Sequence, residues 1–150
     1  MKIGLVVYSG TGHTWRVAER LKEVLSTAGH SVALERLASV EPVSAIEAEG
    51  PSPVSGYEAL VFGAPVHGGL PAPPMAQYLE HIDSLEGKRV ACLVTGLFPP
   101  GLGRNQALAQ MEAVCESKGA TLCGSGSVGW LSLRRKRQIA STVESLAALF

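Results

Sequence analysis

Five runs of apolar and β-branched residues divide the chain and predict five β-strands. They span Ile3 to Tyr8, Ser31 to Leu37, Glu58 to Gly63, Arg89 to Thr95 and Thr121 to Val128. The runs IGLVV and ALVFG are continuously apolar rather than alternating, which is typical of strands covered on both faces. We therefore expect a sheet buried between two layers of helices.

Apolar residues spaced three and four apart between these runs predict amphipathic helices. The periodic sets are Val17, Leu21, Val24 and Ala28, then Met75, Leu79 and Ile82, then Leu108, Met111 and Val114, and finally Ile139, Val143 and Leu146. Strands that alternate with helices indicate a parallel sheet, and right-handed crossovers make it an α/β three-layer doubly wound sandwich. We expect residues 1–150 to form a single domain.

The segment of residues 38–58 interrupts this regular alternation. It contains three prolines and two glycines, which leave room for at most a short helix around Val43 to Ala48. We expect a reduced crossover here.

The composition limits the classes of protein to which the chain can belong. Hydrophobic residues make up 46% and charged residues 17%, which excludes a disordered chain. Thirteen Lys and Arg balance thirteen Asp and Glu, so we expect neither nucleic acid nor a membrane as partner. No apolar run approaches the ~18 residues that span a bilayer, and the N-terminus MKIGLVV lacks the flanks of a signal peptide. A cytoplasmic protein is expected.

Cysteine and histidine show no pattern of their own. Cys92, Cys115 and Cys123 are odd in number and form no C-x-x-C pair, so neither a disulfide framework nor a thiol redox motif is indicated. The four histidines have no carboxylate or thiolate at ligand spacing, so no metal site is predicted.

The segment SGTGHT, Ser9 to Thr14, joins the first predicted strand to the first predicted helix. The first amides of a helix lack internal partners and carry partial positive charge, so an anion there gains directed hydrogen bonds and about 0.3–1 kcal/mol from the helix dipole. Gly10 and Gly12 let the backbone curl around a phosphate, and the Ser9, Thr11 and Thr14 hydroxyls can donate to its oxygens. Because the loop contains no Lys or Arg, it would meet the phosphate charge with dipoles alone.

Three other interpretations of this loop are open. Its residues could simply cap the helix. A Walker loop requires a lysine followed by Ser or Thr, and none lies within reach. The dinucleotide fingerprint G-x-G-x-x-G begins at Gly10 and Gly12, and Glu35 ends the second strand where a ribose-binding acid belongs. Trp15 occupies the third glycine position, however, and its bulk disfavours a nicotinamide-binding Rossmann module.

The stretch YSGTGHT resembles the S/T-x-T-G-x-T phosphate loop of flavodoxins, and the five-strand pattern extends the resemblance over the whole chain. The resemblance implies a flavodoxin-like fold with a five-stranded parallel sheet of order 2-1-3-4-5. It also implies FMN, bound non-covalently by three loops at the carboxyl edge of the sheet. The phosphate would be held by Ser9, Gly10, Thr11, Gly12, His13 and Thr14, with His13 where many flavodoxins have asparagine.

The second loop, GAPVHGGLPAPP at residues 63–74, is similar to a G-T-P-x-x-x-G segment that lines the flavin ring in the quinone-reductase branch. The resemblance implies that six residues approach the flavin, namely Ala64, Pro65, Val66, His67, Gly68 and Gly69. The paired glycines would permit a peptide flip near the flavin N5 atom, and His67 could couple proton uptake to reduction. A Gly/Pro turn before a helix is the simpler alternative.

The third loop is TGLFPPGLGRNQ at residues 95–106. By the same resemblance, the pyrimidine side of the flavin would be covered by Thr95, Gly96, Leu97, Phe98, Pro99 and Gly101. Phe98 is the only aromatic residue in these two flavin loops, whereas flavodoxins usually stack Trp or Tyr on the ring. Since the two loops carry no Asp or Glu, we expect a less negative potential for the second electron than in acidic carriers.

The resemblance implies an FMN-binding electron-transfer protein that shuttles electrons between a reductase and an acceptor enzyme, as a monomer or weak homo-oligomer. An NAD(P)H-dependent FMN quinone or azo reductase and a non-redox nucleotide-binding module are the alternatives. The cluster RRKR, Arg134 to Arg137, precedes the last predicted helix. It would lie near the flavin edge and steer an acidic partner protein or the phosphates of NADPH. A solvated charged turn is its simpler interpretation.

Overall fold

One twisted sheet organises the computed structural model, which describes residues 1–37, 54–97 and 100–150. Its five parallel strands are β1 (Lys2–Val7), β2 (Ser31–Arg36), β3 (Ala59–His67), β5 (Arg89–Gly96) and β6 (Thr121–Gly129). They lie in the order β2-β1-β3-β5-β6. The two-residue β4 (Leu70–Pro71) pairs antiparallel with the end of β3 outside this path. With β4 set aside, the predicted strand order 2-1-3-4-5 is confirmed.

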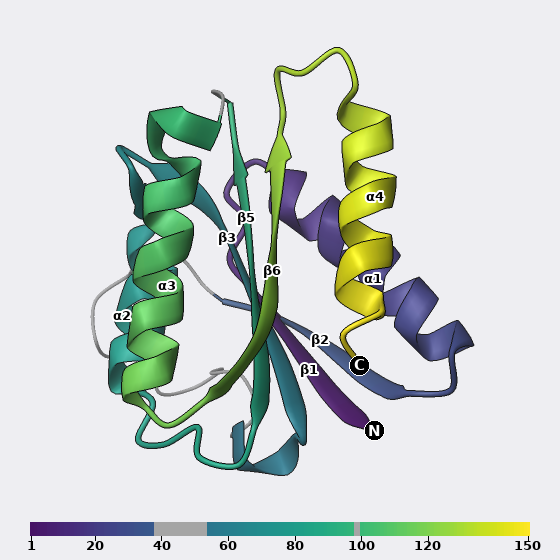
Figure 1. The fold of residues 1–150 in the computed structure, drawn as a ribbon, viewed down its shortest axis with the longest axis vertical. Coiled ribbons are helices and arrows are strands. Elements are labelled where there is room, and N and C mark those ends of the chain that lie inside the picture. Colours follow the sequence, from purple (N-terminus) through teal and green to yellow (C-terminus); the bar gives the residue numbers. More distant parts are fainter. Residues whose placement is uncertain (38–53, 98–99) are drawn as a thin grey trace.

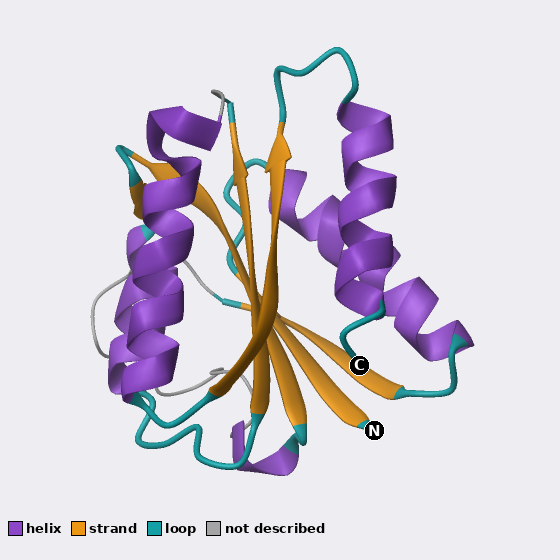
Figure 2. Cartoon of the chain, viewed as in Figure 1, coloured by secondary structure: helices purple, strands orange, loops and turns teal. Residues whose placement is uncertain are grey.

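Helices cover both faces of the sheet (Figures 1 and 2). On one side lie α1 (His13–Thr27) and α4 (Arg135–Ala147), and on the other lie α2 (Pro73–His81) and α3 (Asn105–Ser117). The predicted three-layer α/β sandwich is therefore confirmed. In the described part of the chain, none of the helices has the length and apolarity that crossing a membrane would require.

Each helical layer has its own apolar core. The α2/α3 layer packs around residues such as Phe62, Met75 and Met111, all fully buried. The α1/α4 layer packs around Leu5 and Leu21, also buried. Burying each such side chain stabilises the fold by about 1.5–3 kcal/mol relative to leaving it exposed. Because both faces of the sheet are covered, the strands are continuously apolar in sequence.

The strand β6 carries glycines because α4 and the residues after it approach its face closely. A Cβ atom added at Gly126 would lie 2.5 Å from Thr142 Cγ2 in α4, and one at Gly124 would lie 2.8 Å from Leu149 Cδ1, just beyond the end of α4. These glycines therefore fix how α4 is set against the sheet. The sheet and α4 together determine where the turn between them lies.

The loops differ from the sequence-based expectations in two places. β3 continues to His67 instead of ending at Gly63, and the chain then turns back into β4. Before α3, a helical turn η3 (Pro100–Arg104) is kinked at Leu102 and Gly103. The short helix expected at residues 43–48 lies outside the described residues, which resume at the 3-10 turn η2 (Val54–Gly56).

Candidate functional site

The carboxyl edge of the sheet is formed by the segments that follow β1, β3, β5 and β6. Of the described residues predicted to bind a cofactor, Ala64 to His67 lie in the last part of β3 and Thr95 and Gly96 end β5, while the others follow β1, β3 or β5. The helix α1 begins at this edge, directly after the loop that follows β1. The loops of the prediction are thus brought together by the strand order β1-β3-β5-β6.

The loop Ser9–Thr14 has the shape of an anion-binding turn. Gly12 precedes α1 with φ 89°, a left-handed conformation that favours glycine, and open space lies where its Cβ would stand. Among the described residues, no group accepts a hydrogen bond from the backbone amides of residues 10–14. The first turn of α1 also contains no acidic residue. Free amides and an unopposed helix dipole fit a phosphate group.

Ser9 hydrogen-bonds the first turn of α1 and can still donate its hydroxyl proton. Its Oγ accepts a hydrogen bond from the Trp15 amide at 3.3 Å, although the N-cap position itself is Gly12, which has no side-chain cap. A hydroxyl that accepts one bond still has its proton to donate. The hydrogen bond to the Trp15 amide and phosphate binding are therefore compatible at Ser9.

The Thr14 hydroxyl is placed differently from the sequence-based expectation. Thr14 is buried, and its Oγ1 lies 2.8 Å from Thr95 Oγ1 in a hydrogen bond. This bond joins the start of α1 to the end of β5 beneath the loop. Thr14 can present its backbone amide to a phosphate, but its side chain, like that of Thr95, faces the protein interior.

His13 stacks on an aromatic residue that the sequence analysis did not single out. The imidazole lies 4.0 Å from the Trp130 ring centroid with planes 14° apart. Arg135 stands on the indole at 5.0 Å and donates from Nη1 to the Trp130 carbonyl at 3.2 Å. Burial lowers the pKa of His13, and the charges of Arg135 and Arg16 lower it further. The neutral imidazole is therefore the favoured form.

The expectation that the phosphate loop works without cations requires correction. The loop itself has none, but other elements supply them. Arg36, at the end of β2, donates to the Ser9 carbonyl at 3.1 Å and lies over the Trp15 ring at 5.0 Å. Arg16 and Arg135 are near enough to influence the pKa of His13. Arg36 and Arg135, which are distant in sequence, and Arg16, two residues beyond Thr14, thus give the loop a positive surrounding.

The predicted second loop is a β-hairpin. Gly68 and Gly69 have φ 59° and 80°, and positive φ at both central residues is the signature of a tight type I′ turn. Ala64 is fully buried and pairs with Val94 inside the sheet, so its expected role at a flavin is not supported by its position.

The remaining predicted residues of this segment occupy the hairpin arms and tip. Pro65 pairs with Thr95, and its carbonyl accepts from the Ala72 amide at 2.9 Å. Val66 and His67 pair with β4, which leaves the Gly68–Gly69 turn and the exposed His67 side chain at the tip. The glycines therefore serve the fold of the hairpin, whatever they contribute to a ligand.

The third loop is described in part. Gly96 lies at the end of β5, where its carbonyl accepts from the Trp130 amide at 2.7 Å, and Leu97 is exposed. Gly101 lies in η3. Phe98 and Pro99 lie outside the described residues.

Arg104 is a second residue that the sequence analysis missed. It is only 5% exposed, and its Nη1 donates to Ser127 Oγ at 2.7 Å. A Cβ at Gly96 would lie 2.9 Å from its Cγ, so the glycine makes room for the arginine stem. Burial lowers the pKa of this guanidinium, which nonetheless stays protonated. Arg104 therefore fixes a buried positive charge across the ends of β5 and β6.

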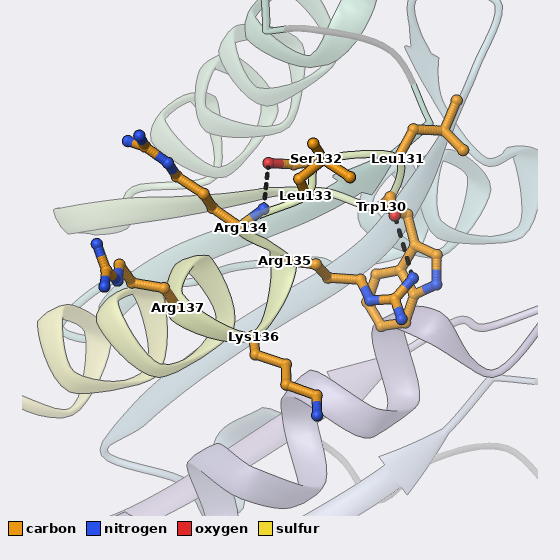
Figure 3. A pocket seen from close by; sticks show the side chains of 8 residues that line it. All are labelled: Trp130, Leu131, Ser132, Leu133, Arg134, Arg135, Lys136 and Arg137. Atoms are coloured by element: carbon orange, nitrogen blue, oxygen red, sulfur yellow. Dashed lines mark hydrogen bonds between the residues drawn. The ribbon is translucent and has the colours of Figure 1, made fainter.

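The cluster Arg134 to Arg137 lies at the carboxyl edge, as expected. It begins α4 directly after the turn that follows β6. Residues 130–137 line an open hollow of about 790 Å³ (Figure 3). Through Arg135 and Trp130, one side of this hollow connects with His13 in the phosphate loop.

No group of three or more His, Cys, Asp or Glu residues within the described ranges could hold a metal ion.

Comparison with known proteins agrees with this geometry. The family model of the flavodoxin domain matches residues 5–122. No match was found among curated proteins. One similar solved structure is oxidised flavodoxin 2 from Bacillus cereus, with 22% identity, a TM-score of 0.72 and full coverage of both chains at 100%. Oxidised flavodoxin 1 from the same organism has 15% identity and a TM-score of 0.75, covering 99% of this chain and 96% of that one. At these identities, the similarity of the structures establishes the fold.

Proposed function

The chain belongs to the flavodoxin family, and from this premise we propose that it binds FMN and carries electrons between a reductase and an acceptor enzyme. The observation that supports this most strongly is the Ser9–Thr14 loop. Its amides, which no described residue accepts from, its left-handed Gly12 and the start of α1 form a cradle suited to a phosphate monoester.

In this proposal the three segments have different tasks. The loop after β1 would hold the phosphate through backbone amides and the Ser9 and Thr11 hydroxyls. The hairpin tip at His67 to Gly69 and the segment after β5 would flank the ring. Bound FMN supplies one- and two-electron redox chemistry, while the protein supplies position and electrostatics.

The electrostatics of the site favour added negative charge. Arg104 places a buried cation at the ends of β5 and β6. Reduction of a flavin adds negative charge, and a nearby fixed cation stabilises it. This arrangement supports the expectation of a less negative potential for the second electron.

Purified protein reconstituted with FMN tests the proposal. It should turn yellow, quench flavin fluorescence and accept electrons from an NADPH-dependent flavodoxin reductase. It should then pass them to an acceptor such as cytochrome c. A chain that binds no FMN, or that binds it but passes no electrons, would contradict the proposal.

A second candidate is an NAD(P)H-dependent FMN oxidoreductase acting on quinones or azo compounds. The cations at residues 134–137 favour it, because the phosphates of NADPH need positive partners. Oxidation of NADPH by a quinone, with the FMN-loaded protein alone and no added reductase, would decide for this enzyme.

A further inference from the structure

The exposed apolar side chains of this protein gather at the carboxyl edge. Large hydrophobic residues exposed there, within the described ranges, are Leu70 (46%), Leu97 (50%), Leu102 (67%), Leu131 (67%) and Leu133 (105%). Only Met1 and Val24 are comparably exposed elsewhere in the described chain. Scattered exposed leucines need no explanation, but a group around one site marks an interaction surface.

The segments at the ends of β1, β3, β5 and β6 carry a one-sided charge, whereas β2 ends in both Glu35 and Arg36. Residues 8–16, 63–72, 95–97, 100–104 and 129–138 contain six Arg or Lys, which are Arg16, Arg104, Arg134, Arg135, Lys136 and Arg137. These segments contain no Asp or Glu. The opposite edge, around the starts of β1, β3 and β5, carries both signs, with Glu58, Asp83 and Glu86 beside Lys2, Lys88 and Arg89. The described surface around the start of α4 is therefore locally positive, although the formal net charge of the chain is zero.

Within the described part of the chain, three of these cations have no side-chain partner. Arg134, Lys136 and Arg137 are exposed at the start of α4, where positive charge opposes the helix dipole. Arg135 differs, because its guanidinium lies over the Trp130 ring and donates a hydrogen bond to the Trp130 carbonyl. Exposed cations that cost helix stability, next to exposed Leu131 and Leu133, indicate a surface shaped for a partner.

We propose that Leu102, Leu131, Leu133, Arg134, Lys136 and Arg137, here called the basic rim, form a docking surface for an acidic partner protein. This inference rests on the proposed electron-transfer function, because such a partner would be held beside the flavin. Leucines would supply the apolar centre of the contact and the cations its steering rim.

The shape of the basic rim favours a protein over a lipid surface. Arg134 and Arg137 extend to one side of the α4 start, and Lys136 extends toward α1 (Figure 3). A flat anionic surface could meet only part of this set at once. The hollow at residues 130–137 is instead suited to a protruding acidic segment.

The test measures binding to a plant-type [2Fe–2S] ferredoxin, chosen for its acidic surface, at about 20 and about 200 mM NaCl. The rim variant R134E/R137E is compared with R20E/K22E, which changes the charge equally on the exposed side of α1. We expect the rim variant to weaken binding about tenfold at low salt and to flatten the salt dependence, with less than about twofold change in the control. L131S/L133S should weaken binding equally at both salt concentrations.

Several outcomes would overturn the proposal. The first is that the wild type does not bind ferredoxin. The second is that both charge variants lose ferredoxin binding equally, and the third is that NADPH competes with ferredoxin for the basic rim. Stronger rim-dependent binding to vesicles of 70% phosphatidylcholine and about 30% phosphatidylserine would assign the surface to a membrane instead. FMN titration of the same samples separates the two proposals. A rim that binds ferredoxin in a chain unable to bind FMN contradicts only the proposed function.

Discussion

The imidazole of His13 lies flat against the indole of Trp130, with ring centroids 4.0 Å apart. His13 belongs to the loop after β1, and Trp130 to the turn after β6. The contact ties the candidate phosphate loop to the basic segment that begins α4. Arg135 extends the stack on the indole, so a charge change in that segment should be felt at His13.

This coupling predicts a measurable shift in the pKa of His13. Removing the guanidinium in Arg135→Gln should raise the lowered pKa toward 6.5, though only in part, because burial is the larger cause. Proton NMR titration of the His13 ring measures this directly. Arg137→Gln serves as the matched control, and an equal shift in both variants would contradict specific coupling.

The same pKa makes a prediction about stability and pH. Because the folded-state pKa lies below 6.5, the unfolded chain binds more protons in the interval between the two values. The contribution of neutral His13 to the free energy of unfolding is therefore fully present above pH 6.5, and it is lost as the pH drops through the folded-state pKa. Urea unfolding across this interval should show a smaller decline in His13→Gln than in the wild type.

Gly12 should be intolerant of a side chain for conformational reasons. Its φ of 89° costs a non-glycine residue about 1–2 kcal/mol, although open space surrounds the missing Cβ. Gly12→Ala should lower the free energy of unfolding by about that amount and weaken FMN binding. Gly10→Ala, whose Cβ would make an ordinary 3.5 Å contact with the Tyr8 hydroxyl, is the control for stability.

The buried Thr14–Thr95 hydrogen bond should behave as a coupled pair. Thr95→Val leaves the Thr14 hydroxyl without this partner, and we expect a loss of about 1–3 kcal/mol. The double variant Thr14→Val/Thr95→Val should cost less than the sum of the single changes. Additive losses in a denaturant double-mutant cycle would show that the bond contributes little.

Arg104 should raise the potential of a bound flavin. Arg104→Met keeps much of the stem against Gly96 but removes the buried charge. We expect a more negative midpoint potential for the second electron by spectroelectrochemical titration. An unchanged potential would contradict this role, and so would a wild-type potential as negative as that of acidic carriers. Arg20→Met, on the exposed side of α1, is the control.

The fold was predictable because its signals are local and repeated. Continuous apolar runs such as ALVFG identify buried parallel strands without knowledge of their neighbours. The Ser9–Thr14 loop was predictable for a similar reason, since a strand, a glycine-rich turn and a helix follow one another directly.

Other parts of the site depend on contacts between distant residues. Trp130 belongs to the site because it stacks on His13, and Arg104 because its stem fits the space at Gly96. Contacts of this kind between distant residues leave no periodic pattern in the sequence. The hairpin is different, because Gly68 and Gly69 between Val66 and Leu70 are a recognisable two-residue turn signal. The sequence analysis assigns these glycines either to a peptide flip near a flavin or to a Gly/Pro turn before a helix, and neither interpretation is a hairpin.

The central claim is that the Ser9–Thr14 loop holds the phosphate of FMN, and comparison of FMN with riboflavin tests it most directly. Flavin fluorescence titrations of the apoprotein should give an affinity about 100-fold or more higher for FMN, since riboflavin lacks the charged group that the loop's amides would bind. Gly12→Ala should reduce this difference. Equal affinities for the two flavins, or a difference unaffected by Gly12→Ala, would contradict the account.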